Sequence, residues 1–342
     1  MSVLQSKNLI TLYKMKKIGI NGFGRIGRCF ARYALLQNDI EIALVNDLGD
    51  LKTLAHLFKY DSIHGVLKEE FEVKDNSIVF KNGKKIVFIS EKDPSNIPWG
   101  KFGVETVIES TGLFLTQEKA ELHLKGGAKK VILSAPANDN TKTIVLGVND
   151  ETLLSSDTVI SNASCTTNCA APLIKVMMEI AEIESAMLKT VHSFTSDQRL
   201  HDAPHKDLRR ARAATMSIIP TSTGAAKALW KIFPELDGKM AGSSMRVPVS
   251  DGSITEFTFM LKNEVSVATI NEAFKKAAET NLKGILRYTD EPIVSVDIIG
   301  DRHSSIFDSD LTLVIGKMVK LSAWYDNEAG YSSRLLDLVN LV

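Results

Sequence analysis

The sequence predicts an α/β protein: a doubly wound parallel sheet of the Rossmann type, then an α+β domain with a mixed, largely antiparallel sheet. The first part begins with an apolar strand at 17–21 that runs into the glycine-rich turn 22–27 and a helical pattern. Apolar strand-like runs then alternate with helical or turn segments as far as residue 161. The second part carries several further strand-like runs but few helical patterns between them, which favours antiparallel pairing.

The glycine-rich turn has the spacing of a dinucleotide site. Gly22-Phe23-Gly24-Arg25-Ile26-Gly27 spells G-x-G-x-x-G, in which glycines allow a tight turn and close approach of a pyrophosphate to a helix N-terminus. The next predicted strand, 40–46, is followed by Asp47, 20 residues beyond Gly27. An acidic side chain at this distance binds the ribose hydroxyls, and it repels a 2′-phosphate. The sequence therefore predicts NAD as the cofactor, in preference to NADP.

The remaining elements of the first part follow in chain order. We expect a helix at 51–60, hairpins within 70–90, a strand at 104–109, a helix at 118–124 ended by two glycines, and strands at 131–133 and 158–161. Small polar residues follow three of the strands, at Asn46-Asp47, Ser110-Thr111 and Ser134. In an open parallel sheet these strand ends form the ligand crevice, so the series supports a cofactor cleft.

A cysteine follows the last strand of the first part. Ser161 to Asn168 reads SNASCTTN and precedes an apolar, helix-like run at 170–180. Unpaired N–H groups at a helix N-terminus favour thiolate over thiol, so Cys165 is a candidate nucleophile. A lone cysteine is more often inert packing, and only its wider context reverses that expectation. Pro172 predicts a kink or a late start of this helix.

The second part is predicted from weaker signals. A strand at 185–195 carries His192 near its end, and a stretch dense in charge without clear period follows at 196–215. Four strand-like runs (256–262, 292–299, 311–315 and 319–324) and two helices (271–282 and 328–339) complete the expectation.

Composition excludes several classes of protein. The 342 residues carry 41 Lys plus Arg and 41 Asp plus Glu, so no net charge attracts nucleic acid or an anionic membrane. No apolar run approaches the roughly 18 residues of a membrane helix. The three cysteines are few and odd in number, which favours a reducing cytoplasm. His201 and His205 have Pro204 between them, so we expect no metal site. Residues 1–15 are interpreted as an N-terminal extension.

Longer motifs connect these features. NGFGRIGR at 21–28, SNASCTTN at 161–168, HSFT at 192–195, IIPTSTGAAKA at 218–228 and WYDNE at 324–328 stand in this order. From about Lys16 to its C-terminus the chain resembles the phosphorylating glyceraldehyde-3-phosphate dehydrogenases of the bacterial glycolytic type. The resemblance implies NAD-dependent oxidation of glyceraldehyde 3-phosphate, with inorganic phosphate, to 1,3-bisphosphoglycerate. It also implies a homotetramer, an NAD-binding domain (16–164 and 327–342, the C-terminal helix returning to it) and a catalytic domain (165–326).

The resemblance also implies roles for individual residues. Cys165 would form the hemithioacetal and the thioester, and His192 would handle the proton beside it. Thr195 and Arg246 match the site for the substrate phosphate; the site for the attacking phosphate is matched by Ser164, Thr166, Arg210, Thr223 and Gly224. The cofactor would contact Gly22, Phe23, Gly24, Arg25, Ile26, Gly27, Asp47, Lys92, Ser110, Thr111, Phe114, Ser134 and Asn327, the last through the nicotinamide carboxamide.

Several positions depart from the family pattern. Ala203 stands where NAD-specific bacterial members have leucine before Pro204, which lowers one barrier to NADP. Lys92 replaces a common arginine and Ala329 an aromatic residue, and the stretch 249–252 differs from the threonine- and asparagine-containing version of the family. Two other interpretations stay open. One is an erythrose-4-phosphate dehydrogenase, although that family differs around the substrate-phosphate threonine and the TSTGAA motif, both of which this chain keeps. The other is a non-catalytic binding protein on the same fold.

Overall fold

The computed structural model describes residues 15–342, so the predicted extension at 1–15 lies outside the described residues except for Met15. The first sheet has the strand order β10-β9-β8-β1-β2-β7-β6-β5. Neighbouring strands from β10 to β7 run parallel, and the β5-β6-β7 hairpins are antiparallel. The bounds are β1 Lys16–Asn21, β2 Ile40–Asn46, β5 Phe71–Lys74, β6 Ser77–Phe80, β7 Lys85–Ile89, β8 Thr106–Glu109, β9 Lys130–Leu133 and β10 Val159–Ser161. This confirms the predicted parallel-rich sheet.

Helices cover both faces of that sheet. On one face α1 (Arg25–Ala34), α2 (Leu51–Lys59) and α8 (Ala329–Leu341) enclose a core built around residues such as Ile20 and Phe30. The other face packs against Trp99 and against the short helices α3 (Gln117–Ala120) and α4 (Leu122–Lys125). These two helices replace the single helix predicted at 118–124. A short pair, β3 (Tyr60–Asp61) and β4 (Gly65–Val66), lies beyond α2.

The second sheet is mixed, as predicted, with the order β12-β13-β11-β14-β18-β16-β15 and β17 on the side of β18. Only β11-β13 and β15-β16 are parallel pairs. The bounds are β11 Ile183–Ser193, β12 Ile219–Thr221, β13 Met240–Val247, β14 Ser253–Leu261, β15 Leu286–Thr289, β16 Ser305–Asp308, β17 Leu313–Ile315 and β18 Met318–Tyr325. Helices α5 (Cys165–Ile180), α6 (Ala225–Ile232) and α7 (Val267–Glu279) pack on it.

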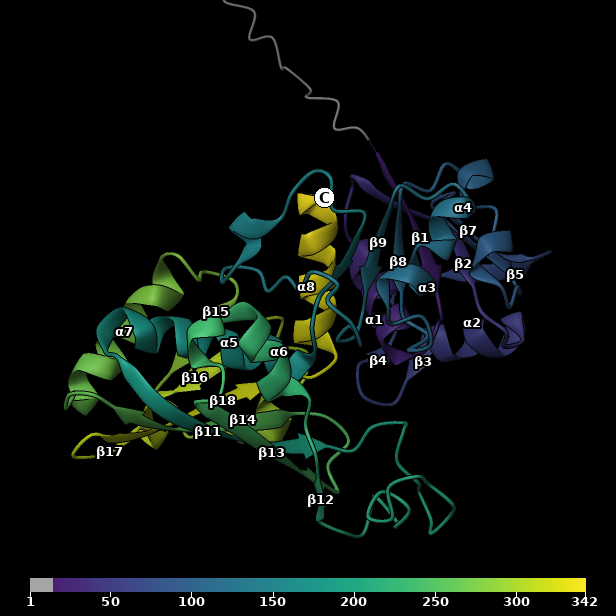
Figure 1. Cartoon of the computed structure of the whole chain (residues 1–342). Coiled ribbons are helices and arrows are strands. Elements are labelled where there is room, and N and C mark those ends of the chain that lie inside the picture. Colours follow the sequence, from purple (N-terminus) through teal and green to yellow (C-terminus); the bar gives the residue numbers. More distant parts are fainter. Residues whose placement is uncertain (1–14) are drawn as a thin grey trace, which may run out of the picture.

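The C-terminal helix α8 stands between the two halves of the molecule, beside α1 (Figure 1). Leu335 and Leu338 enter the core of the first sheet, while Tyr331 donates a hydrogen bond to the carbonyl of Ala163, just before α5. Lys16 at the start of β1 donates to the last carbonyls of α8, at Val339 and Asn340. The chain end is therefore tied to the first sheet and to the segment that carries Cys165.

The strand predicted at 292–299 was wrong. Residues 295–298 form a 3-10 turn instead of part of a strand at 292–299, because the carboxylate of Asp297 accepts the backbone N–H of Val294 at 2.8 Å. Of the two alternatives predicted from Pro172, a late start of helix α5 is wrong, since the helix begins at Cys165 and contains Pro172, and the kink stays a prediction. Ser164 fixes that start: its side chain accepts the N–H of Thr167.

Candidate active site

Cys165 and His192 come together from different elements at the junction of the two halves. Cys165 is the first residue of α5, as predicted, and is half-buried against both hydrophobic cores. His192 lies near the end of β11 and is buried. The Sγ atom of Cys165 is 3.5 Å from Nε2 of His192, within the distance of a sulfur hydrogen bond. This is the nucleophile–base contact that the sequence predicts.

The second nitrogen of His192 is held by backbone and by a cation. Nδ1 lies 2.8 Å from the carbonyl oxygen of Ser193 and 2.6 Å from Nη1 of Arg246. The same Nη1 donates to the Ser193 carbonyl at 3.0 Å. These two contacts favour opposite tautomers, because the Ser193 carbonyl accepts a proton from Nδ1 whereas Arg246 can only donate and needs the Nδ1 lone pair. In the tautomer with the proton on Nδ1, Nε2 presents its lone pair to Cys165 and the ring can act as a base toward the sulfur.

Burial and Arg246 set the protonation of this pair. Burial, followed by the charge of Arg246, lowers the pKa of His192 to about 3, so the imidazole is neutral at physiological pH. Burial raises the pKa of the Cys165 thiol, although Arg246 and the backbone N–H of Thr166 act in the opposite direction. The helix N-terminus thus favours the thiolate as expected, but burial outweighs it. In the free site a thiol therefore lies beside a neutral imidazole.

A cavity of about 950 Å³ opens in front of the pair. Besides Cys165 and His192, its wall includes six other residues predicted for the site: Arg25, Ile26, Ser134, Ser164, Thr195 and Asn327. Glu328 and Tyr331 from the α8 region also line it, as do Ser196 and residues 198–201 of the long loop between β11 and β12. Figure 1 shows this loop running outward from the second sheet. The cavity connects the glycine turn to the sulfur.

The glycine turn fits a dinucleotide. A Cβ atom on Gly22 would lie 2.8 Å from the backbone of Ser110, and one on Gly27 would lie 2.3 Å from the carbonyl oxygen of Gly22, so close strand–helix packing requires both glycines. Gly24 is exposed, with open space above it, and it starts α1 without a side-chain cap. The first N–H groups of α1 are thus presented bare at the surface, as a pyrophosphate requires.

Other predicted cofactor residues shape the crevice around this turn. Asp47, directly after β2, accepts the N–H of Phe23 at 2.6 Å and that of Gly49 at 2.8 Å. Asn327 is buried, and its Oδ1 accepts hydroxyl protons from Ser193 and Ser253, both at 2.8 Å. Its NH₂ group is left to donate to a carboxamide oxygen in the cavity.

Some predicted residues have other surroundings. The Phe23 ring is buried in the first core beside Phe58 and Phe88, so only its backbone faces the turn. Ser110 donates to the carbonyl of Gly22 at 2.6 Å, and Phe114 packs its ring edge near His123. Lys92 is exposed. None of these side chains lines the cavity.

Several residues predicted to bind phosphate make hydrogen bonds within the protein. Thr166 is buried with its hydroxyl 2.9 Å from that of Tyr325. Thr223 accepts the N–H of Ala225, and Gly224 begins α6. Ser164 holds the N–H of Thr167, as described above.

Sequence reasoning missed Asp197. Thr195 donates its hydroxyl proton to Asp197, and Arg210 pairs with the same carboxylate at 2.5 Å. Asp197 thereby occupies two donors that an incoming anion would use. It lies in the long loop that showed no period, so nothing in the pattern singled it out.

Glu109 was also missed. It is fully buried at the end of β8 and accepts from Asn21 at 2.6 Å, from His123 at 3.0 Å and from the backbone N–H of Thr111 at 2.8 Å. Trp99 donates to the other nitrogen of His123 at 3.1 Å, which leaves the proton on the nitrogen that faces Glu109. This network fixes the loop after β8 at the edge of the crevice.

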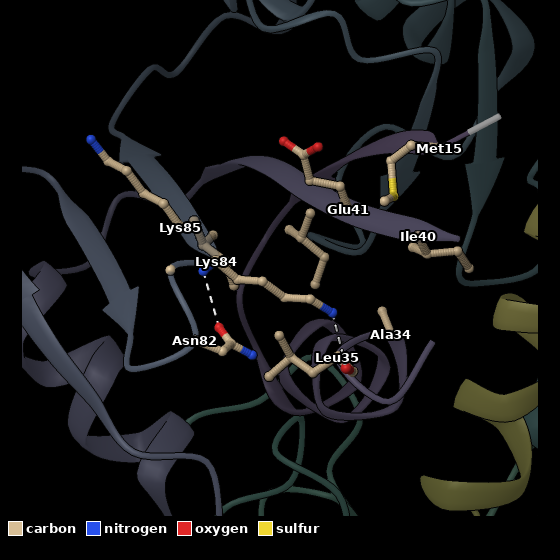
Figure 2. A pocket seen from close by; sticks show the side chains of 11 residues that line it. Met15, Ala34, Leu35, Ile40, Glu41, Asn82, Lys84 and Lys85 are labelled. Carbon is tan, nitrogen blue, oxygen red and sulfur yellow. Dashed lines mark hydrogen bonds between the residues drawn. The ribbon is translucent and has the colours of Figure 1, made fainter. Parts of the chain in front are cut away.

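A second hollow, of about 420 Å³, lies at the other end of the first sheet (Figure 2). It is bounded by the end of α1, by β2 and by the turn between β6 and β7. Lys84 extends across it toward the carbonyl oxygen of Leu35 at 3.4 Å, and Asn82 accepts the Lys84 backbone N–H at 3.0 Å. Its lining holds no cysteine or histidine, so it lacks the nucleophile–base contact of the larger cavity.

The sequence was compared with known proteins. Residues 16–117 match the family described as glyceraldehyde 3-phosphate dehydrogenase, NAD binding domain, and residues 164–327 match its C-terminal domain. Similar proteins include the glyceraldehyde-3-phosphate dehydrogenases of Geobacillus stearothermophilus (56% identity over 94% of this chain and 96% of the relative) and Mycobacterium tuberculosis (54%, 95% and 98%). Glyceraldehyde-3-phosphate dehydrogenase 1 of Bacillus cereus is 53% identical over 95% of this chain and 97% of its own.

Proposed function

Because the chain belongs to the glyceraldehyde-3-phosphate dehydrogenase family, we propose that the cavity between its two sheets is where it oxidises and phosphorylates glyceraldehyde 3-phosphate. The chain is an NAD-dependent oxidoreductase. The observation that carries the assignment of the site is the 3.5 Å contact between Cys165 Sγ and His192 Nε2. The assay that tests it is NADH formation from glyceraldehyde 3-phosphate, measured with and without inorganic phosphate.

The residues divide the chemistry between them. Cys165 bonds the aldehyde carbon while His192 takes the thiol proton and returns it to the new oxyanion, giving a hemithioacetal. The N–H at the start of α5 and the protonated ring stabilise that oxyanion. The chemistry that bound NAD would supply is acceptance of a hydride from this carbon. His192 takes the hydroxyl proton as the hydride leaves, which gives a thioester. Inorganic phosphate then displaces the sulfur, and the released thiolate regains its proton from His192.

The binding roles follow the same layout. The bare N-terminus of α1 would hold the pyrophosphate, Asp47 the adenosine ribose, and the NH₂ group of Asn327 the nicotinamide carboxamide. Arg246 and Thr195 would bind the substrate phosphate. Arg246 contacts His192, and Thr195 lines the cavity. The residues proposed to bind the attacking phosphate are Ser164, Thr166, Arg210, Thr223 and Gly224. Arg210 must release its ion pair with Asp197 before it can bind the anion.

Three coarser features complete the proposal. Separate cores support a cofactor domain at 16–164 and 327–342 and a catalytic domain at 165–326. The long loop carries exposed apolar side chains at Leu200, Leu208, Met216 and Ile218, which supports burial against other copies in a homotetramer. No helix within residues 15–342 is long and apolar enough to cross a membrane. The three free cysteines support a reducing cytoplasm as its compartment.

Asp47→Ser should change the preference between cofactors. The substitution removes a charged hydrogen-bond acceptor from the ribose, a loss of about 1.5–3 kcal/mol, so KM for NAD rises roughly 10- to 100-fold. It also removes the carboxylate that repels a 2′-phosphate, so kcat/KM with NADP increases. Steady-state kinetics with both cofactors measure this, and thermal unfolding serves as the control for folding. Equal efficiency of wild type with NAD and NADP would contradict the role of Asp47.

A further inference from the structure

A cluster of ionisable side chains lies behind Asn327, outside the pair that performs the chemistry. It contains Asp251, Asp326, Glu328 and His64. Asp251 is fully buried, and only one of its oxygens has a donor: Oδ1 accepts the N–H of Gly252 at 2.9 Å. Its Oδ2 has no hydrogen-bond partner among residues 15–342 and lies 3.8 Å from Nε2 of His64. The segment 249–252 that carries Asp251 also departs from the family pattern.

Asp326 is the carboxylate that builds the turn holding Asn327. Its Oδ1 accepts the N–H groups of Glu328 at 2.8 Å and Ala329 at 2.7 Å, and its Oδ2 accepts that of Gly300 at 2.7 Å. These donors occupy both oxygens of Asp326. One oxygen of Asp251, one oxygen of Asp326 and one nitrogen of His64 all lie within 4.8 Å of one another. A charge on buried Asp251 would therefore face a second carboxyl group without a donor for its own Oδ2.

We propose that Asp251 and Asp326 hold one proton between them at neutral pH, and that loss of this proton in alkaline solution weakens NAD binding by loosening the turn at 326–329. This rests on the proposed function, in which Asn327 on that turn holds the nicotinamide. Burial and the charges of Asp326 and Glu328 raise the pKa of Asp251 to about 8, which places the change just above neutral pH.

The other groups that face Asp251 act in a consistent direction. Burial disfavours a charged His64, but its hydrogen bond to Glu328 and the charges of Asp326, Glu328 and Asp251 raise the pKa of His64. Arg25 of α1 forms ion pairs with Glu328 and Asp61 and not with Asp251. Through space, ionised Asp251 raises the pKa of Cys165. As pH rises, His64 loses its positive charge and Asp251 gains a negative one, and both changes add repulsion around the turn.

Asp251→Asn tests the proposal, because asparagine keeps the shape of the protonated acid and cannot ionise. We expect KM for NAD of wild type to rise by roughly tenfold between pH 7.5 and 9.5, with a smaller change in kcat. Asp251→Asn should keep the neutral-pH value of KM throughout. His64→Gln is the matched control: it removes the neighbouring titration and leaves the carboxyl pair, so the alkaline rise persists.

Thermal unfolding of the same proteins separates this role from a packing defect. A carboxyl whose pKa is raised from 3.8 to about 8 binds its proton more tightly in the folded state, so its contribution to stability is lost as pH rises from 4 to 8. The Tm of Asp251→Asn should therefore exceed that of wild type by a margin that grows over this range. A variant that merely packs badly would have a lower Tm at every pH.

Two outcomes would overturn the proposal. One is an alkaline rise in KM that is unchanged in Asp251→Asn, or absent from wild type. The other is stoichiometric metal in the dialysed protein, with KM at pH 7 raised by EDTA in wild type but not in Asp251→Asn, because a cation would then stand in place of the proton. Neither outcome resembles failure of the proposed function, in which wild type would form no NADH at any pH.

Discussion

Cys165→Ser loses NADH formation almost completely, by at least ~10⁴-fold in kcat. The hydroxyl of serine is a far weaker acid than a thiol, and its oxygen is a poorer leaving group when phosphate attacks the acyl carbon. The neutral His192 beside it cannot compensate, because burial and Arg246 keep the pKa of the imidazole at about 3. Stopped-flow or coupled absorbance at saturating substrate and phosphate measures the loss.

Cys169→Ser is the matched control for that experiment. Cys169 lies one turn further along α5, is fully buried, and contacts Ser305 rather than the cavity. Its replacement should leave turnover within a few-fold of wild type. If Cys165→Ser retained substantial activity while binding NAD normally, the sulfur would not be the nucleophile.

His192→Asn should lower kcat by about 10²–10⁴-fold, with little change in KM for NAD. Asparagine can still donate to the oxyanion but cannot accept the thiol proton, so the acid–base contribution is lost and the site is otherwise kept. The pH profile provides a second readout. Because the pKa of His192 is about 3, its protonation does not reduce wild-type activity between pH 7 and 5, whereas the raised pKa of Cys165 makes alkylation by iodoacetamide faster toward alkaline pH.

Equal turnover by His192→Asn and wild type would show that the ring only positions neighbouring groups. A fall in the affinity for NAD together with kcat would indicate a displaced β11 instead. Thermal unfolding and NAD titration therefore accompany the kinetics.

The parallel strands β1, β2, β8, β9 and β10 of the first sheet could be predicted close to their observed bounds, because they are continuous apolar runs between glycine and polar turns. Ile40–Asn46 is buried on both faces and was predicted at its observed bounds. The second sheet was harder to predict. Met240–Val247 reads MAGSSMRV, whose small and polar residues give little sign of a strand, yet it is held between β11 and β12. Whether such a segment forms a strand depends on its pairing with neighbouring strands.

The same distinction applies to the site. Cys165 at a helix start follows from local sequence, and His192 needed the family motif, because nothing local places β11 beside α5. Asp197 and Asp251 could not be predicted. Asp197 contacts Arg210, which lies 13 residues away in the sequence, and Asp251 lies close to Asp326, which is 75 residues away. Only the fold brings these residues together.

The central claim is that the sulfur of Cys165 carries the acyl group while His192 handles the proton. It is tested most directly by mixing enzyme, NAD and glyceraldehyde 3-phosphate without inorganic phosphate, quenching in acid, and locating the adduct by peptide mass spectrometry. We expect one phosphoglyceryl group per chain on the peptide containing Cys165, formed together with one NADH and released when phosphate is added before the quench. NADH formed without any adduct on Cys165, or an adduct on another residue, would contradict this account.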